Sequence, residues 1–200
     1  MRRILIALSL PLMLLAACAE PTWAPEPEVQ RALHVTGEPP SITLFTVIRR
    51  SSGEGAHAGL MVDAGHRAIF DPAGTWFHRT APERNDVHFG ITDRLLGFYI
   101  DYHARETYDV VEQKVYVTPE VAQQAMAVIQ SHGAVPKAMC GLAVSSVLRS
   151  IPGFEDIPRT YFPARIMAAM AQKPGVRTRT HVDGDSDDNA GLLIAQASTP

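Results

Sequence analysis

The sequence predicts an α+β domain with a mainly antiparallel sheet and packed helices. Residues 41–48 form a β-branched and aromatic run, which is typical of a strand. Two short apolar runs, at residues 56–63 and 67–71, flank Ala64-Gly65 and indicate a hairpin. One helix, one strand and then several helices are expected to follow. This order, strands first and helices later, favours an antiparallel sheet packed against helices.

The chain begins with the features of an export signal. Two arginines precede an apolar segment at residues 4–15, which is too short to span a bilayer. The sequence Leu15-Ala16-Ala17-Cys18 resembles the bacterial lipobox, which implies cleavage before Cys18 and attachment of lipid to that residue. The alternative is an ordinary secreted protein that is cut near Ala19 and loses Cys18. We therefore expect residues 1–17 to be a lipoprotein signal peptide.

Lipidation would place the chain on a membrane surface and not through it. By resemblance to Gram-negative lipoproteins, Ala19 after the cysteine, where Asp is absent, implies the periplasmic face of the outer membrane. Removal of residues 1–17 takes two arginines from the 18 basic residues and leaves 16 against 21 acidic ones, a net charge of −5. No basic patch is evident in the sequence, which argues against nucleic acid as a partner.

Two segments outside the predicted domain are expected to lack a core of their own. Residues 18–40 contain five prolines among polar residues, which predicts a semi-extended tether behind the lipidated cysteine. Residues 182–200 include an acidic stretch and are predicted to be a disordered tail. Because the tail lacks the spacing and the closing Glu of an EF-hand, we expect no calcium loop there. The domain itself is expected to occupy residues 41–181.

Four further elements are predicted within the domain. Thr92-Asp93 could cap a helix that runs through His103, and residues 109–117 have the composition of a strand. Thr118-Pro119-Glu120 is a strong helix start, because a threonine cap is followed by proline at the first helical position. A last helix is expected to begin at Pro163 and to continue to about residue 172.

The remaining helix starts at or next to Cys140. Its apolar residues recur at helical spacing and form one stripe, which consists of Cys140, Val144, Val147, Leu148 and Ile151. A helix N-terminus favours the thiolate, the nucleophilic form of cysteine. The alternative is that Cys140 is a small buried apolar residue, as free cysteines commonly are. With Cys18 lipidated, no disulfide partner remains for Cys140, and either burial or catalysis explains a free thiol in an oxidising compartment.

The hairpin contains the residues that favour catalysis. Strand residues alternate between the two faces of a sheet, so His57 and Gly59 face away from the apolar residues Ala58, Leu60 and Val62. If the loop has an odd number of residues, Asp71 falls on the same face as His57, at a cross-strand Cβ distance of about 4.5–8 Å. A two-residue loop would place the two side chains on opposite faces. We expect the odd-length loop.

The sequence His57-Ala58-Gly59-Leu60-Met61-Val62, followed by a short turn and a strand that ends in a polar residue, resembles the histidine hairpin of NlpC-type cell-wall cysteine peptidases. In that family the cysteine precedes the hairpin, whereas here Cys140 follows it. The inverted order resembles the circularly permuted branch of the papain-like fold, which includes lecithin:retinol acyltransferase-like proteins. The run at residues 115–121, which leads into a helix, a loop and the cysteine-headed helix, also fits that branch. The resemblance covers about residues 41–151.

The resemblance implies a role for each of three residues. Cys140 would be the nucleophile, His57 the base, and Asp71 the group that orients the imidazole ring. Met139 departs from the pattern, because the permuted families often carry asparagine before the cysteine; oxyanion stabilisation is then left to the backbone N–H of Cys140. Asp71 stands where NlpC-type proteins commonly have histidine, and a carboxylate can perform the same orienting role.

The implied function is that of a thiol hydrolase or acyltransferase acting on an amide or ester. A peptidoglycan stem-peptide bond is the first expectation for the substrate, and an acyl-lipid is the second. The alternative is a non-catalytic envelope lipoprotein that uses the same fold as a cell-wall- or protein-binding module. We expect no cofactor and no metal. A zinc site of His57, Asp71 and His78 is the alternative here, but the ligand spacing typical of zinc sites is missing.

Overall fold

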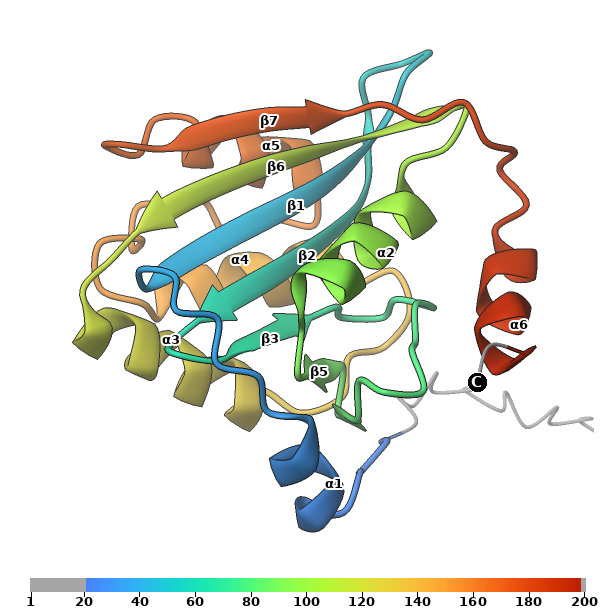
Figure 1. Ribbon diagram of the computed structural model, residues 1–200. Helices are drawn as coiled ribbons and strands as arrows, with labels where there is room; N and C mark the ends of the chain where they lie inside the picture. Colours follow the sequence, from blue (N-terminus) through green and yellow to red (C-terminus); the bar gives the residue numbers. More distant parts are fainter. Residues whose placement is uncertain (1–20, 199–200) are drawn as a thin grey trace, which may run out of the picture.

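Seven strands form one sheet in the computed structural model, which describes residues 21–198 (Figure 1). The order across the sheet is β4-β5-β3-β2-β1-β6-β7, and each neighbouring pair is antiparallel. The predicted α+β class with a mainly antiparallel sheet is therefore confirmed. The strands are β1 (Ser41–Arg49), β2 (Gly55–Asp63), β3 (Arg67–Phe70), β4 (Glu83–Arg84), β5 (Val87–Phe89), β6 (Tyr108–Tyr116) and β7 (Arg177–His181).

Helices cover both faces of the sheet. The helices of the described residues are α1 (Glu26–Ala32), α2 (Asp93–His103), α3 (Pro119–Ser131), α4 (Cys140–Arg149), α5 (Pro163–Met170) and α6 (Ala190–Ser198). Helices α3, α4 and α5 pack on β1 and β2 from one side, and α2 lies on the other side (Figure 1). Among the described residues, no helix combines the length and the apolar character that crossing a membrane requires.

The predicted helix starts are confirmed by their caps. The side chain of Thr92 accepts a hydrogen bond from the N–H of Leu95 at the start of α2, and Thr118 does the same for Val121 at the start of α3. Both hydroxyls satisfy an N–H group that the first helical turn leaves without an intrahelical partner. Helix α5 begins at Pro163, as predicted, because proline tolerates the first turn of a helix.

Alternation along the central strands creates two cores. Leu44, Leu60 and Phe70 belong to the buried cluster under α3, α4 and α5. Their neighbours Phe45 and Ile69 belong to a second buried cluster that packs against α2. The face to which a strand residue points therefore decides which layer of helices it contacts.

The turn between β2 and β3 determines where the polar residues of the hairpin point. Asp63 pairs with Arg67, so the loop contains three residues, 64–66. The predicted odd-length loop is confirmed. Because Leu60 pairs with Phe70, the position opposite Asp71 is Gly59, and Asp71 lies diagonal to His57 on the same face of the sheet, the face that α2 covers.

The structure corrects the prediction of a tether for residues 21–40, whereas residues 18–20 lie outside the described part. Helix α1 occupies the middle of this segment, and its Val29 is buried in the core. The N–H of Ala24 donates to the carbonyl of Glu83, and the Arg84 guanidinium lies over the ring of Trp23. Proline was misread as a sign of extended chain, because Pro at the first turn of a helix favours the helix that follows.

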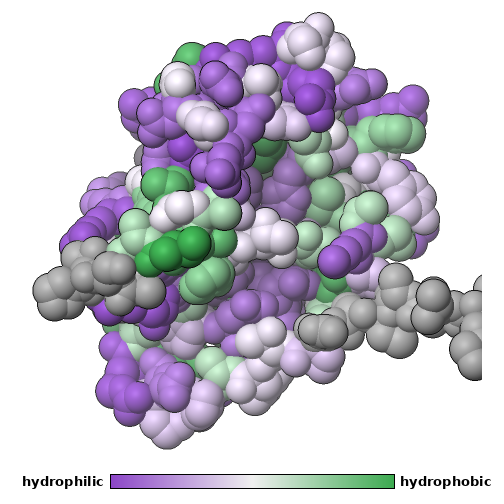
Figure 2. Space-filling model, turned by 90° about the vertical axis from the view of Figure 1, so that its right-hand side faces the viewer, coloured by the Kyte–Doolittle hydropathy of each residue, from purple (hydrophilic) through white to green (hydrophobic). Residues whose placement is uncertain are grey.

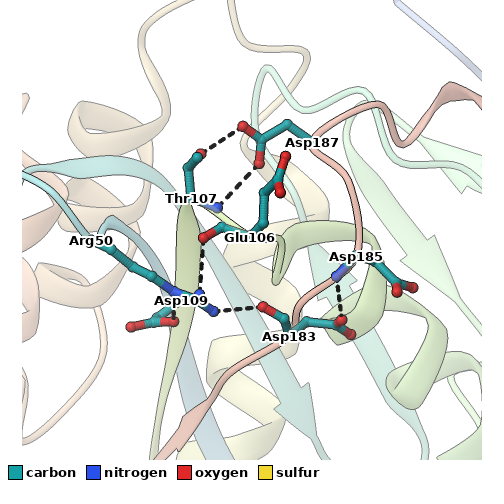
Figure 3. A network of polar contacts seen from close by, with 7 residues as sticks. All are labelled: Arg50, Glu106, Thr107, Asp109, Asp183, Asp185 and Asp187. Carbon is teal, nitrogen blue, oxygen red and sulfur yellow. Dashed lines mark hydrogen bonds and ion pairs between the residues drawn. The ribbon is translucent and has the colours of Figure 1, made fainter.

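The C-terminal segment also differs from the predicted disordered tail. Arg50 donates to the carbonyl of Asp183 at 2.7 Å, and the side chain of Thr107 donates to the carboxylate of Asp187 at 2.7 Å (Figure 3). The N–H of Glu106 donates to the carbonyl of Asp185 at 2.8 Å. Residues 183–189 thus run along the loop that precedes β6, and α6 follows. The acidic composition of this segment predicted disorder, because composition alone does not reveal hydrogen-bond donors such as Arg50 and Thr107 elsewhere in the fold.

Candidate active site

Three elements bring the predicted catalytic residues together. His57 lies on β2 and points to the α2 side of the sheet, and Asp71 directly follows the last residue of β3. Cys140 is the first residue of α4, which packs against β2. Since β3 ends opposite Leu60, the β3-facing side of β2 has no strand partner beside His57, and Cys140 reaches the histidine there.

His57 and Asp71 form a close ion pair. Nε2 of His57 donates to Oδ1 of Asp71 at 2.7 Å. The hydroxyl of Tyr99, on α2, donates to the same oxygen at 2.8 Å. The side chain of Asp71 is 1% exposed, so its charge is held by these two donors in a buried setting. A carboxylate bonded in this way fixes both the position and the tautomer of the imidazole.

Two glycines make room for this carboxylate. A Cβ at Gly59 would lie 2.2 Å from the Tyr99 hydroxyl oxygen and 3.3 Å from Oδ1 of Asp71. A Cβ at Gly74 would lie 1.8 Å from Oδ2 of Asp71. Neither glycine has a positive φ angle, so glycine is needed at these positions because a side chain would not fit, and not because of the backbone conformation. Glycine inside a strand often marks a close approach of this kind, and that signal was present at Gly59 in the sequence.

The sulfur of Cys140 lies among hydrogen-bond donors. His57 and the backbone N–H groups of Ala58 and Gly141 lie close enough to it to lower the pKa of the thiol. Because Nε2 of His57 binds Asp71, Nδ1 is the ring nitrogen left to interact with the sulfur. A Cβ at Gly141 would lie 2.4 Å from the carbonyl oxygen of Tyr161, so the residue after Cys140 must be glycine for this loop to pack against α4.

These contacts favour a thiolate–imidazolium pair. Burial alone lowers the pKa of His57, but the charges and hydrogen bonds of Asp71 and Cys140 outweigh it and raise that pKa to about 10. Burial raises the pKa of the Cys140 thiol, and the bond and charge of His57 with the two N–H groups outweigh that effect, so the pKa lies below its ordinary value. The neighbouring imidazolium likewise overcomes burial and holds the pKa of Asp71 well below its usual range.

A second histidine packs on the first. The rings of His57 and His103 are nearly parallel, 5° apart, with centroids separated by 5.4 Å. Nδ1 of His103 donates to the carbonyl of Tyr99 at 2.8 Å. Burial, together with the positive charge of His57, lowers the pKa of His103 to about 4, so this ring is neutral at pH 7. His103 therefore covers the His57 imidazolium without adding a second charge.

The loops that carry Asp71 and precede Cys140 share one anchor. The carbonyl of Asp86 accepts from the N–H of Asp71 at 2.8 Å, and its side chain accepts from the N–H of Val135 at 2.7 Å. Asp86 has a φ of 66° in the two-residue turn between β4 and β5. Two residues before Cys140, Ala138 also has a positive φ, 63°. A non-glycine residue in this region stores backbone strain, as often seen near active sites.

A cavity of about 270 Å³ opens beside the histidine pair. His57 and His103 line it from the sheet and from α2, and Asp187 and Asn189 line it from the C-terminal segment. Cys140 does not line it, so the cavity reaches the site from the histidine side. The segment predicted to be a disordered tail thus forms part of the wall of the site.

The structure also shows where the residues of the alternative zinc site lie. His78 is not part of the ligand group that the described residues form around His57 and Asp71, and its Nδ1 contacts the hydroxyl of Thr80. Instead, His57, Asp71 and His103 place three ligand atoms within 4.8 Å of one another. Nε2 of His57 and Oδ1 of Asp71 are, however, only 2.7 Å apart, which is a hydrogen bond and closer than two ligands sit around one zinc ion at about 2.0–2.2 Å bonds. The arrangement observed suits proton transfer.

Sequence reasoning missed Tyr99 and His103 as parts of the site. Tyr99 is 1% exposed, as a core residue would be, but its hydroxyl donates to Asp71. The two residues are four apart on α2 and therefore share a helix face, which is the signal that could have found them. Cys18, the predicted lipidation site, lies outside the described residues.

Comparison with known proteins gives no family for this chain. No protein-family model matches the sequence, and searches of the curated proteins and of the solved structures find no match. The case for function therefore depends on the geometry of the site.

Proposed function

We propose that the protein is a thiol hydrolase or acyltransferase that acts on an amide or ester through Cys140, His57 and Asp71. One observation carries the proposal: His57, which donates to Asp71, also lies close enough to Cys140 to lower the pKa of its thiol, although the two residues are 83 positions apart in the chain. A buried structural cysteine has no need of an imidazole held by a buried carboxylate. The chain order His57, Asp71, Cys140 supports a circularly permuted papain-like domain of the NlpC type.

The chemistry follows from the positions of these groups. The Cys140 thiolate attacks the carbonyl carbon, a C–S bond forms, and the carbonyl electrons move to oxygen, where the backbone N–H of Cys140 can stabilise them. The His57 imidazolium then gives its proton to the leaving nitrogen or oxygen as that bond breaks, which leaves a thioester. Water or an acceptor hydroxyl or amine attacks the thioester and gives a proton to His57. The thiolate leaves, and the imidazolium–thiolate pair is restored.

Alkylation of the thiol tests the proposal directly. A thiol with the ordinary pKa of about 8.5 is only about 3% thiolate at pH 7, and its reaction with iodoacetamide slows about tenfold for each lower pH unit. We expect alkylation of Cys140 to remain fast below pH 7. His57→Ala should restore the ordinary pH dependence, whereas His66→Ala, in the loop of the same hairpin, should leave it unchanged. Cys140→Ser should abolish labelling. A native protein inert to iodoacetamide from pH 6 to 9 would rule out a catalytic thiol.

We also propose that Cys18 carries lipid and holds the protein at the periplasmic face of the outer membrane. The lipobox-like sequence supports this assignment. A peptidoglycan stem peptide is the first candidate substrate and an acyl-lipid the second, both present in that compartment. Cys18→Ala should move the protein from the membrane fraction to the soluble periplasm, and membrane retention of that variant would show that the anchor is something else.

The second candidate is a non-catalytic module that binds cell wall or protein partners. The small exposure of Cys140, 8%, favours it, because a substrate must reach the sulfur. A rapid reaction of Cys140 with a small alkylating agent that is lost in His57→Ala would decide for the enzyme, since a binding module does not require an activated thiol.

A further inference from the structure

A second cavity, of about 900 Å³, lies along the N-terminal half of α2. Its walls come from α1, the loop at residues 78–82, α2 and α6, and it shares no lining residue with the cavity beside His57. Figure 2 shows this side of the molecule, where hydrophobic side chains gather beside a hollow lined by hydrophilic ones. Cavities of about 300–1,000 Å³ are the size that small-molecule ligands occupy.

The cavity is cationic although the chain is not. Three arginines from three different segments line it, Arg31 on α1, Arg79 in the loop and Arg94 on α2, whereas Glu28 is the only acidic residue among its described lining residues. Over the whole chain the net charge is −3. Burial, and then the charges of Arg79 and Arg94, lower the pKa of His78. The positive potentials of these two arginines therefore overlap at His78, which lines the cavity. Within residues 21–198, Arg31 and Arg94 have no acidic partner.

The floor of the same cavity is apolar. Leu95 and Phe98 contribute from α2, and Leu192 contributes from α6. A ligand that fits therefore combines a negative group with a hydrocarbon part. A nucleic acid would instead require a row of basic residues along an open surface.

The walls are held in place without a ligand. The carbonyl oxygen of Ala32, at the end of α1, would lie 2.3 Å from a Cβ at Gly90, so α1 packs directly against that glycine. The side chain of Gln196 accepts from the N–H of Arg79 and donates to the carbonyl of Phe77, which ties α6 to the loop. A preformed cavity loses little conformational entropy when a ligand binds.

We propose that this cavity, called the cleft from here on, binds an anionic lipid. The phosphate headgroup lies against Arg31 and Arg94, and an acyl chain lies along Leu95, Phe98 and Leu192. The predicted lipid anchor also favours a lipid over a free phosphate. Cys18 precedes α1 by eight residues, which span at most about 28 Å when extended. An anchored chain would thus hold this cleft close to the bilayer surface. The site is separate from the thiol site and does not depend on the proposed catalysis.

Calorimetry with short-chain lipids tests the site. The protein would be the Cys18→Ala chain, which carries no lipid of its own, and the probe dihexanoyl phosphatidylglycerol. We expect one molecule to bind, and the zwitterionic dihexanoyl phosphatidylcholine to bind at least about tenfold more weakly. Arg31→Gln and Arg94→Gln should each weaken binding about fivefold, and together about 25-fold, as expected for basic residues near an anionic lipid. Leu192→Ser should weaken binding of the lipid but not of glycerol 1-phosphate.

Three results would overturn the assignment. Equal affinity for the two lipids would remove the role of charge, and equal affinity for glycerol 1-phosphate would make this a phosphate site and not a lipid site. Arg179→Gln, an exposed arginine of β7 outside the cleft, is the matched control, and an equal loss in that variant would show non-specific attraction. The alkylation rate of Cys140 should stay unchanged in every cleft variant, which separates loss of this site from loss of fold or of the thiol site.

Discussion

Gly59→Ala tests the close packing of β2 against Tyr99 and Asp71. The added Cβ would lie 2.2 Å from the Tyr99 hydroxyl oxygen, a separation that non-bonded atoms do not adopt. Tyr99 is 1% exposed and packs edge-on against Phe45, with ring centroids 5.4 Å apart, so it cannot swing into solvent. The substitution must therefore displace the tyrosine within the core and break its hydrogen bond to Asp71.

Two terms give the expected size of the effect. Losing a hydrogen bond to an ionised, buried carboxylate costs about 1.5–3 kcal/mol. Forcing one extra methyl group into a packed core costs about 1–3 kcal/mol more. We therefore expect Gly59→Ala to lower the free energy of unfolding by about 2.5–6 kcal/mol, a large part of the 5–15 kcal/mol typical of natural domains.

Urea unfolding at pH 7 measures this change, and a double-mutant cycle identifies its cause. Tyr99→Phe removes the hydroxyl that the new Cβ would strike. The double variant should thus be more stable than the sum of the two single changes by at least about 1 kcal/mol. Gly97→Ala is the matched control, because Gly97 lies in α2 with no atom within 4 Å of its Cβ position, and alanine there should stabilise by about 0.5–1 kcal/mol.

Strict additivity in this cycle would refute the reasoning, because it would mean that residue 59 and the Tyr99 hydroxyl do not interact. A Gly59→Ala protein within about 1 kcal/mol of the parent would refute it as well. Alkylation of Cys140 offers an independent check, since a displaced Tyr99 leaves Asp71 with one donor fewer and loosens its hold on His57.

Three further predictions follow from the charges. Turnover, once a substrate is known, should persist from below pH 7 until His57 loses its proton near pH 10, and a rate that falls above pH 8 would contradict the pair. His88 is buried, which lowers its pKa to about 4. Below pH 6.5 the unfolded chain therefore binds a proton at His88 that the folded chain does not, which lowers the free energy of unfolding by about 1.4 kcal/mol per pH unit. In urea titrations His88→Asn should remove this contribution and leave the equal contribution of His103. Arg50→Ala should speed amide hydrogen exchange at Glu106 and Thr107, whereas Arg49→Ala, which contacts Tyr108, should not.

The sequence was informative wherever a local pattern dictates local structure. Alternation on β2 predicted which face His57 takes, and the cap at Thr118 predicted the start of α3, because both effects act within a few residues. Strand β7 was not predicted from the sequence, because Arg177 to Thr180 are exposed and polar and show no alternation of apolar and polar residues. Charged, polar residues are what an edge strand requires, and only its pairing with β6 shows that it is a strand.

The site was predictable only in part, for a related reason. His57 lies on one strand of a hairpin and Asp71 directly follows the other, so their contact could be predicted from whether the loop has an odd or an even number of residues. Tyr99 reaches Asp71 from a different layer, and nothing within a few residues of either reveals the contact. The same limit applies to Asp187, whose place in the wall of the site depends on Thr107, 80 residues away in sequence.

The charge states around Asp71 favour the thiolate form of Cys140 in spite of its burial. The Asp71 carboxylate raises the pKa of His57, His88 and His103, and burial lowers all three. Only His57 is hydrogen-bonded to the carboxylate, and only its pKa is raised overall. One positive charge therefore sits beside the sulfur, and the two other rings remain neutral at pH 7. Burial that would silence an isolated thiol is thus offset by this imidazolium and by two backbone N–H groups. An Asp71→Asn variant would keep the shape of the site and lose that charge, so it should slow alkylation of Cys140 below pH 7 while leaving the rate at pH 9 nearly unchanged; an unaltered rate at pH 6 would show that the carboxylate has no part in activating the thiol.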